Sequence, residues 1–407
     1  MITVQAGVVS PDARHIYVMS DSLSQRGPGE YASGVIGWSR GPRGGIRFAE
    51  PVACFVHPLI GRRPPKCGVV SEWPDSLAGV PDVIGPDLYA RSMAISHDGR
   101  SLYVSYASSV IGFARDPATG ALQQMPQAGG CLVRALAPGT SCTLTRAIRG
   151  AEHLVVAPDD GTVYLTFNGE RTSGVAVLAR NRASGALTQL PGPAGCVSPG
   201  LPGCTRARQL TRTSDVQVAP DGRTVYVTST HFPGGGISVF DRDRRDGSLV
   251  QRPGRQGCTN RTGARGCHRE RRFAPVDSAA IAADGTRLFT IERESIRGPT
   301  LHRIAHDGTV GGSAPAPRLP PRRESPDELA IGANDELVVA GHSFGVYVYT
   351  ATRARSMHLA ACWTVLRVRP CRRVGDLDLG LPNSEPIPAP NGVVYVDGNG
   401  GLYTLRL

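Results

Sequence analysis

Charged side chains recur at one position of this sequence, five or six residues before a tight turn of Pro-Asp-Gly type. Five of the seven occurrences include an acid. Clustered acids can bind a cation, and a carboxyl group with a raised pKa can serve as a general acid or base. Along the chain, the paired residues at this position are Gln5 and Ala6, Arg91 and Ser92, Glu152 and His153, Ser214 and Asp215, Asp277 and Ser278, Asp327 and Glu328, and Ser384 and Glu385.

The third pair indicates acid–base chemistry. His153 can act as an acid or base, Glu152 can assist it, and Arg91 can stabilise a developing oxyanion. The other candidates are binding residues: Asp215, Asp277, Asp327, Glu328 and Glu385 at the same position, and His231 and His342 in loops that follow second strands. The alternative is a structural role, in which the acids accept hydrogen bonds from neighbouring linkers or pair with the many arginines.

An internal repeat predicts the elements that position these residues. Its clearest copies are residues 96–105 and 218–229, and weaker copies begin at Ser10, Ala157, Ala282, Gly332 and Ala389. Each unit has an apolar run, a turn of Pro-Asp-Gly type, an alternating strand such as 224–228 and, after a loop, a strand such as 237–240. A second tight turn leads into a fourth strand such as 186–190. Four antiparallel strands in each unit are typical of a propeller blade.

We therefore predict an all-β fold, a seven-bladed β-propeller of four-stranded antiparallel blades that forms a single domain over residues 1–407. An insertion of residues 55–89, rich in Pro and Gly, separates the first two blades. The last unit supplies only three strands, at 387–390, 393–397 and 402–407, so we expect the N-terminal strand at residues 2–5 to complete it and close the ring. The alternative, a linear array of β-sandwiches, conflicts with the near-constant turn chemistry.

The cysteines predict an oxidising compartment. All ten fall into close pairs that follow fourth strands: Cys54 with Cys67, Cys131 with Cys142, Cys196 with Cys204, Cys258 with Cys267, and Cys362 with Cys371. Regular, even spacing without a Cys-x-x-Cys motif predicts local disulfides, each contributing about 2 to 3 kcal/mol. The alternatives are reduced buried thiols, or zinc ligation, for which only His268 adjoins a cysteine. We expect an extracytoplasmic or secreted protein, although no signal peptide is visible at the N-terminus.

The composition argues against several kinds of partner. The formal net charge is +11, but Lys66 is the only lysine and the arginines are scattered, so we expect no nucleic-acid binding. No apolar stretch approaches the ~20 residues of a membrane span. There is no dinucleotide-binding or Walker-type glycine motif. We predict no definite cofactor, leave open a divalent cation such as calcium at the carboxylates, and expect a monomer.

The repeat resembles that of a known family. Residues 220–227, Pro-Asp-Gly-Arg-Thr-Val-Tyr-Val, look like the repeats of YVTN-type and lactonase-like seven-bladed propellers, and the resemblance spans nearly the whole chain. Residues 185–192, followed by Gly195 and Cys196, are similar to a cysteine-bearing, secreted bacterial type. In lactonase-like propellers, histidine and acidic or arginine side chains line the channel. The resemblance of Glu152-His153-Leu154 to the His-bearing start of an inner strand implies a site there.

Two hypotheses for function follow. The first, which the sequence slightly favours, is an extracytoplasmic binding or interaction scaffold that holds a protein, glycan or small-molecule ligand at its loop face and channel mouth. The alternative is an enzyme, a lactonase-like hydrolase or cycloisomerase acting on a small carboxylate or lactone. A serine hydrolase is the least favoured: residues 341–345 fit Gly-x-Ser-x-Gly, but strand alternation follows them where the nucleophile elbow needs a helix.

Overall fold

Short β-strands make up nearly all of the regular structure. The computed structural model describes residues 3–22, 34–56, 67–69, 90–106, 108–134, 142–169, 172–231, 235–271, 273, 275–292, 298–316, 326–332, 337–341, 345–351, 356–364, 371–373, 386–389, 392–398 and 401–406. Helical segments in these ranges are single turns: α1 (Gln127–Gly130), η3 (Gly192–Gly195), η4 (Gly254–Gly257) and η5 (Ala264–Gly266). None of these described helices has the length and apolar character needed to cross a membrane.

The strands form seven sheets, which we number in chain order. Sheet 1 contains β1 (Thr3–Val9), β2 (His15–Ser22), β3 (Gly34–Arg40), β4 (Ile46–Val56) and β5 (Gly68–Val69). Sheet 2 contains β6 (Ala90–Ile95), β7 (Ser101–Tyr106), β8 (Ser109–Arg115), β9 (Leu122–Gln124), β10 (Cys131–Val133) and β11 (Thr143–Leu144). Sheet 3 contains β12 (Ala151–Val156), β13 (Thr162–Asn168), β14 (Ser173–Arg180), β15 (Leu187–Gln189), β16 (Cys196–Ser198) and β17 (Thr205–Arg206).

The remaining four sheets follow the same order along the chain. Sheet 4 contains β18 (Thr213–Val218), β19 (Thr224–Ser229), β20 (Gly236–Arg242), β21 (Leu249–Gln251), β22 (Cys258–Asn260) and β23 (His268–Arg269). Sheet 5 contains β24 (Val276–Ile281), β25 (Arg287–Glu292), β26 (Thr300–Ile304) and β27 (Val310–Pro315). Sheet 6 contains β28 (Pro326–Ile331), β29 (Leu337–Gly341), β30 (Gly345–Ala351), β31 (Met357–Thr364) and β32 (Arg372–Arg373). Sheet 7 contains β33 (Ile387–Ala389), β34 (Val393–Gly398) and β35 (Gly401–Arg406).

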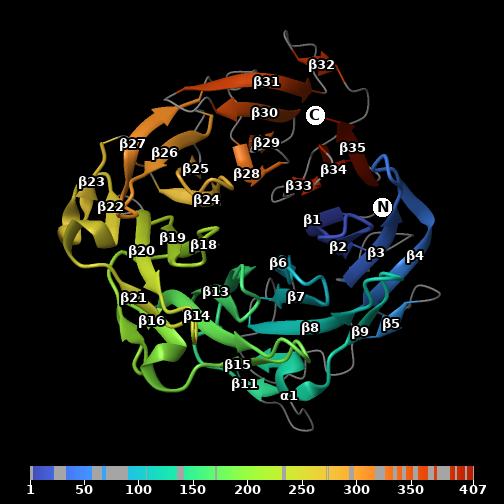
Figure 1. Ribbon diagram of the computed structural model, residues 1–407, viewed down its shortest axis with the longest axis horizontal. Coiled ribbons are helices and arrows are strands. Elements are labelled where there is room, and N and C mark those ends of the chain that lie inside the picture. The colour runs from blue at the N-terminus through green and yellow to red at the C-terminus, as the bar shows by residue number, and fades with distance from the viewer. Residues whose placement is uncertain are drawn as a thin grey trace.

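Each sheet is an antiparallel meander that starts near the centre of the molecule and ends at its rim (Figure 1). In sheets 2, 3 and 4 the fourth strand consists of two separate pieces, and both pieces pair with the third strand. These pieces are β9 and β10, β15 and β16, and β21 and β22. In sheets 1, 2, 3, 4 and 6 a further two-residue strand runs parallel to the fourth, a feature that the repeat pattern did not predict. Most of the predicted insertion at 55–89 lies outside the described residues.

The predicted disulfides are confirmed. Cys54–Cys67, Cys131–Cys142, Cys196–Cys204, Cys258–Cys267 and Cys362–Cys371 are all bonded. Each links the fourth strand of its sheet to the start of the short parallel strand that follows. Sheet 5 has neither a disulfide nor a parallel strand among its described residues.

The sheets surround a central axis in a propeller-like ring (Figure 1). Their first strands lie nearest the centre and contact one another in sequence, and β33 of sheet 7 contacts β1 of sheet 1. The prediction that residues 2–5 complete the last sheet was wrong. β1 pairs along its whole length with β2, so the N-terminal segment is the innermost strand of sheet 1. Side-chain packing joins sheets 7 and 1 instead, with Val4 and Ile387 in one buried cluster.

The hydrophobic core lies between neighbouring sheets. Alternating strands present apolar side chains to both faces, so each sheet packs against the one before and the one after it. The second strand of most sheets carries a fully buried tyrosine, and these are Tyr17, Tyr103, Tyr164, Tyr226 and Tyr395. A buried phenol needs a hydrogen-bond partner, and that requirement explains the next feature.

A hydrogen-bonded link recurs between neighbouring sheets. Tyr103 Oη of sheet 2 donates to Gly185 O of sheet 3 at 2.6 Å and accepts from Arg180 Nε at 2.8 Å. The Arg180 guanidinium also donates to Asp98, in the first turn of sheet 2, at 3.1 Å. Gly185 has φ 75°, a left-handed conformation that favours glycine. We call this arrangement the Tyr–Arg–Asp link.

The same link occurs at two further junctions, as Tyr17–Arg115–Asp12 and Tyr164–Arg242–Asp159. Where sheet 7 meets sheet 1, Arg40 donates to Tyr395. Burial raises the pKa of the Asp98 carboxyl, but hydrogen bonds from Ser96 and the Arg100 N–H, together with Arg180, outweigh burial and lower the pKa below its ordinary value. Part of the high arginine content is therefore structural.

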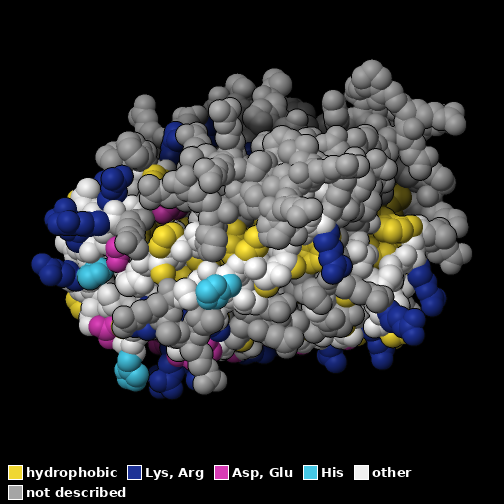
Figure 2. Space-filling view, turned by 90° about the horizontal axis from the view of Figure 1, so that it is seen from above, with side chains coloured by type: hydrophobic (Ala, Val, Ile, Leu, Met, Phe, Trp, Pro, Cys, Tyr) yellow, Lys and Arg dark blue, Asp and Glu magenta, His cyan; other side chains and the backbone are white. Residues whose placement is uncertain are grey.

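The other arginines of the described surface are dispersed. Figure 2, an edge-on view, shows the described Arg side chains at several separate places along the visible rim, with acidic and polar groups among them.

Candidate functional site

A β-bulge near the start of the inner strand in six of the sheets places most of the predicted site residues. In the first six sheets the pairing of the first strand with the second shifts register at this point. A bulge sets two residues opposite one and turns a side chain out of the regular alternation. The residues in the bulges are Gln5, Arg91, Glu152 with His153, Ser214 with Asp215, Asp277 and Asp327.

Hydroxyl side chains on the second strands hold the bulges in place. Thr166 Oγ1 accepts from His153 N at 2.9 Å and donates to Ser214 O of sheet 4 at 3.3 Å. Ser105 Oγ of sheet 2 likewise donates to Glu152 O of sheet 3 at 3.1 Å. In sheet 4, Thr228 Oγ1 accepts from Asp215 N at 2.9 Å. The backbones of the bulges in sheets 3 and 4 are thus tied both to their own sheets and to neighbouring ones.

The bulges of sheets 3 and 4 bring a histidine and an aspartate together. His153 Nδ1 lies 2.9 Å from Asp215 Oδ1, within ion-pair distance. The His153 side chain is 25% exposed, yet its Nδ1 atom is buried. Other atoms of the side chain therefore supply the exposed surface. An imidazole with one nitrogen beside a carboxylate is suited to proton transfer.

Asp215 is held from three sheets. Its side chain is only 6% exposed. Oδ2 accepts from the Ala279 N–H of sheet 5 at 2.8 Å, and Oδ1 accepts from Gln217 Nε2 of its own strand at 3.1 Å. His153 approaches from sheet 3. These contacts leave the carboxylate little freedom to rotate, so Asp215 can fix the orientation of the imidazole.

Arg91 and Glu152 form a second, looser pair. Arg91 Nη1 lies 4.0 Å from Glu152 Oε2, and the two side chains are 37% and 34% exposed. An exposed pair at this distance contributes little to stability. The pair lies beside His153, which follows Glu152 in the same bulge.

The other predicted site residues are less tightly grouped. Asp277 occupies the bulge of sheet 5 and is partly exposed, and His231 is exposed beyond the end of β19. Asp327 and Glu328 are placed by their backbone in β28. Glu385 and His342 lie outside the described residues. Within the described ranges, no three His, Cys, Asp or Glu side chains cluster closely enough to hold a metal ion.

The pairing of His153 with Asp215 was not predicted, although the repeat carried a signal for it. Both residues take the second place of the recurring position, in adjacent units, and adjacent units become adjacent sheets. The hydrogen bond from Ala279 N–H to Asp215 depends on the backbone geometry of the bulge, and no sequence pattern predicts it. The Gly-x-Ser-x-Gly segment connects two paired strands, β29 and β30, which is not the strand-to-helix context of a nucleophile elbow.

Comparison with known proteins indicates the fold. No protein-family model matches the chain, and no curated protein is significantly similar in sequence. The periplasmic gluconolactonase of Pseudomonas aeruginosa is 14% identical, with a TM-score of 0.54 over 96% of this chain and 92% of that one. Hydrazine synthase of Kuenenia stuttgartiensis is 12% identical, with a TM-score of 0.57 over 99% and 95%. A Bacteroides fragilis protein provisionally assigned as a 6-phosphogluconolactonase is 12% identical, with a TM-score of 0.52 over 97% and 94%.

Proposed function

We propose that this chain is a seven-bladed β-propeller of lactonase-like type, a single domain in an extracytoplasmic compartment, that opens a small lactone at the mouth of its channel. The five disulfides support the compartment, because such bonds persist where the surroundings are oxidising. The names of two structural neighbours support the reaction class. The single observation that carries the proposal is the contact between His153 and Asp215.

His153 is the general base in this mechanism. It takes a proton from a water molecule whose oxygen forms a bond to the carbonyl carbon of the lactone. The tetrahedral intermediate then breaks its ring C–O bond, and the leaving alkoxide takes the proton back from His153. One water is consumed and an open hydroxy acid is formed. Asp215 stabilises the imidazolium between the two transfers.

Arg91 supplies positive charge where the oxyanion develops. Its guanidinium lies beside the Glu152 carboxylate, which keeps it at the mouth without a short bond that would compete with a substrate. Because Glu152 and His153 share one bulge, substrate held by Arg91 is brought to the base. The binding-scaffold hypothesis uses the same mouth without this proton transfer.

A lactone-opening assay tests the proposal. Glucono-1,5-lactone and smaller lactones are followed by acid release at constant pH, with and without calcium. We expect His153→Gln and Asp215→Asn each to lower kcat/KM by about 10²- to 10⁴-fold, the range for loss of acid–base catalysis. His306→Gln, an exposed histidine in the turn before β27, is the matched control.

Two outcomes contradict the mechanism. If wild-type protein opens no lactone of the panel, the result favours the binding-scaffold hypothesis for the channel mouth. If lactones are opened equally well by His153→Gln and by wild type, the active residues lie elsewhere. Circular dichroism of each variant separates either result from misfolding.

A further inference from the structure

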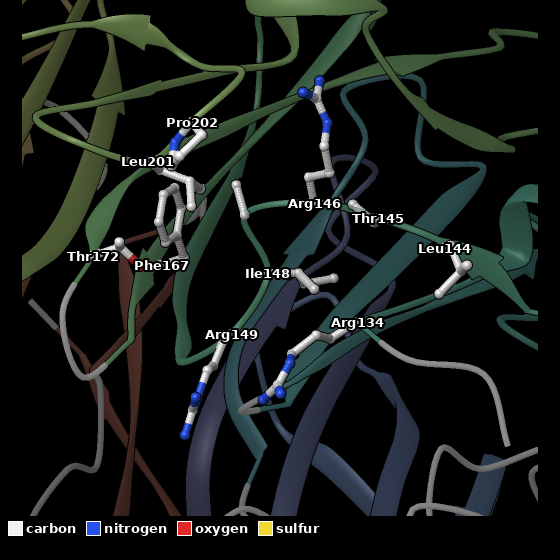
Figure 3. A pocket seen from close by; sticks show the side chains of 11 residues that line it. Arg134, Leu144, Thr145, Arg146, Ile148, Arg149, Phe167, Thr172, Leu201 and Pro202 are labelled. Atoms are coloured by element: carbon white, nitrogen blue, oxygen red, sulfur yellow. The ribbon is translucent and has the colours of Figure 1, made fainter.

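A pocket of about 490 Å³ lies where the linker from sheet 2 meets sheet 3, and its lining contains none of the residues predicted at the channel mouth. Figure 3 shows its lining. Ile148 and Phe167 lie fully buried beneath the pocket, and Leu201 and Pro202 of the Cys196–Cys204 loop provide apolar surface that a ligand can reach. The rim carries Arg134, Arg146 and Arg149, and none of the described lining residues is acidic.

Two positions at this junction carry smaller residues than the equivalent positions of the next junction. Ala147 follows Arg146 in the linker, and Gln209 follows Arg208 at the equivalent place between sheets 3 and 4. Both residues have a left-handed backbone, with φ 58° and 61°. The Gln209 side chain is buried and accepts from Asn260 Nδ2 at 3.2 Å. Two residues after the cysteine of the fourth strand, where sheet 4 has Asn260, sheet 3 has the smaller Ser198.

The two linker arginines confirm that the junctions are equivalent. Arg146 donates to Gly203 O at 3.0 Å and to Gly192 O at 2.7 Å, both in sheet 3. Arg208 donates to Arg265 O and to Gly254 O of sheet 4, each at 2.8 Å. The two linker arginines therefore make equivalent hydrogen bonds at the two junctions. The junctions differ in the size of the residues at the two positions described above.

The charge of the pocket selects its ligand. Arg146 is directed toward the disulfide loop, whereas Arg134 and Arg149 extend to the other end, with Ile148 between them (Figure 3). Arg134 is exposed to solvent. A guanidinium is a strong partner for a carboxylate, and the apolar surface suits a compact hydrocarbon body. A ligand with one anionic end and one apolar end satisfies both parts.

We propose that this pocket binds a small monocarboxylate with a compact apolar body, at a site distinct from the channel mouth. The carboxylate faces Arg134 and Arg149, and the apolar body lies on Leu201 and Pro202. At the next junction the larger Gln209 and Asn260 occupy the positions equivalent to Ala147 and Ser198 and are hydrogen-bonded to each other.

Fluorine NMR tests the site with 4-(trifluoromethyl)benzoate as the probe. We expect its resonance to broaden with wild-type protein, and the neutral 4-(trifluoromethyl)benzamide to bind about tenfold more weakly, equivalent to the loss of one good charged contact. Ala147→Gln copies the residue of the next junction onto a backbone that already accepts it. This variant should weaken benzoate binding by about tenfold or more by filling the space.

Two arginine variants complete the test. Arg134→Gln should weaken binding several-fold, and Arg244→Gln, an exposed arginine in the turn after β20, should not change it. Equal binding of the acid and the amide, or unchanged binding in both Ala147→Gln and Arg134→Gln, would overturn the proposal. Absence of binding in wild type would overturn it as well. Because the readout is binding, each result is independent of whether the chain opens lactones.

Discussion

Burial gives different roles to two histidines of the inner and middle strands. His302 is fully buried, with Nε2 2.8 Å from Thr290 Oγ1 and Nδ1 2.8 Å from Ser313 Oγ. Its ring lies against Phe273, and burial lowers its pKa to about 3. His302 is therefore neutral and structural. His153 has a carboxylate at one nitrogen and a partly exposed side chain, as the proposed mechanism requires.

The buried His302 should make stability depend on pH. Its folded pKa lies below its unfolded value of 6.5, so its contribution is complete above pH 6.5 and is lost as the pH falls toward 3. The free energy of unfolding should fall by at most about 1.4 kcal/mol for each pH unit in this range. We expect the free energy of unfolding, measured in urea between pH 7.5 and 4.5, to show this pH dependence in wild type and in His306→Gln. His302→Gln should lack it. An identical slope in all three proteins would contradict it.

At the scale of single elements, the disulfide loop does more than shorten the unfolded chain. The Cys196–Cys204 loop presents Gly203 O to Arg146, which belongs to the linker from sheet 2. The preceding helix η3 presents Gly192 O to the same guanidinium. The loop therefore braces the rim of one sheet against the linker from its neighbour. The short parallel strand that follows is held in place by this closed loop.

Removal of this disulfide should cost stability and also loosen the junction. For a closed loop of 8 residues the chain-entropy model gives about 2.5 kcal/mol. We expect the Cys196→Ala, Cys204→Ala double variant to lose about that amount in urea unfolding, and amide exchange to rise in residues 196–206 and in the linker 144–149. The corresponding Cys362→Ala, Cys371→Ala variant is the control, since it should leave that linker unchanged. Exchange confined to the cut loop would contradict the bracing role.

At the scale of the whole molecule, local pattern predicted the repeated unit and not the closure of the ring. Alternation and turn residues are properties of a short segment, so strands such as β19 and their turns followed from the sequence. The pairing of residues 2–5 depends on which distant strand is nearest in space. The segment could in principle pair with the outer edge of sheet 7 or with β2. It pairs with β2, the next strand along the chain. The bulges, each a shift of one residue, also left no local signal.

Closure by side chains alone makes the junction of sheets 7 and 1 the place where the ring should open first. Arg40 donates to Tyr395 there, and Tyr395 also donates to Gly44 O at 2.6 Å. Arg40→Met leaves the buried phenol without its charged partner. Arg180→Met removes the equivalent arginine between sheets 2 and 3, where Arg180 also pairs with Asp98 and the chain itself connects the two sheets. A hydrogen bond to a charged group contributes about 1.5 to 3 kcal/mol, so each variant should lose about that amount.

The two variants should therefore differ in where they loosen the molecule more than in how much. We expect amide exchange in Arg40→Met to rise first in β33, β34 and β35 and in β1, because sheets 7 and 1 stand at opposite ends of the chain order and the chain does not run directly from one into the other. In Arg180→Met these strands should keep their wild-type protection while overall stability falls. If amide exchange in β33 to β35 is the same in Arg40→Met and in wild type, contacts with sheet 6 are enough to stabilise sheet 7. The Arg40–Tyr395 contact would then not be required for closure of the ring.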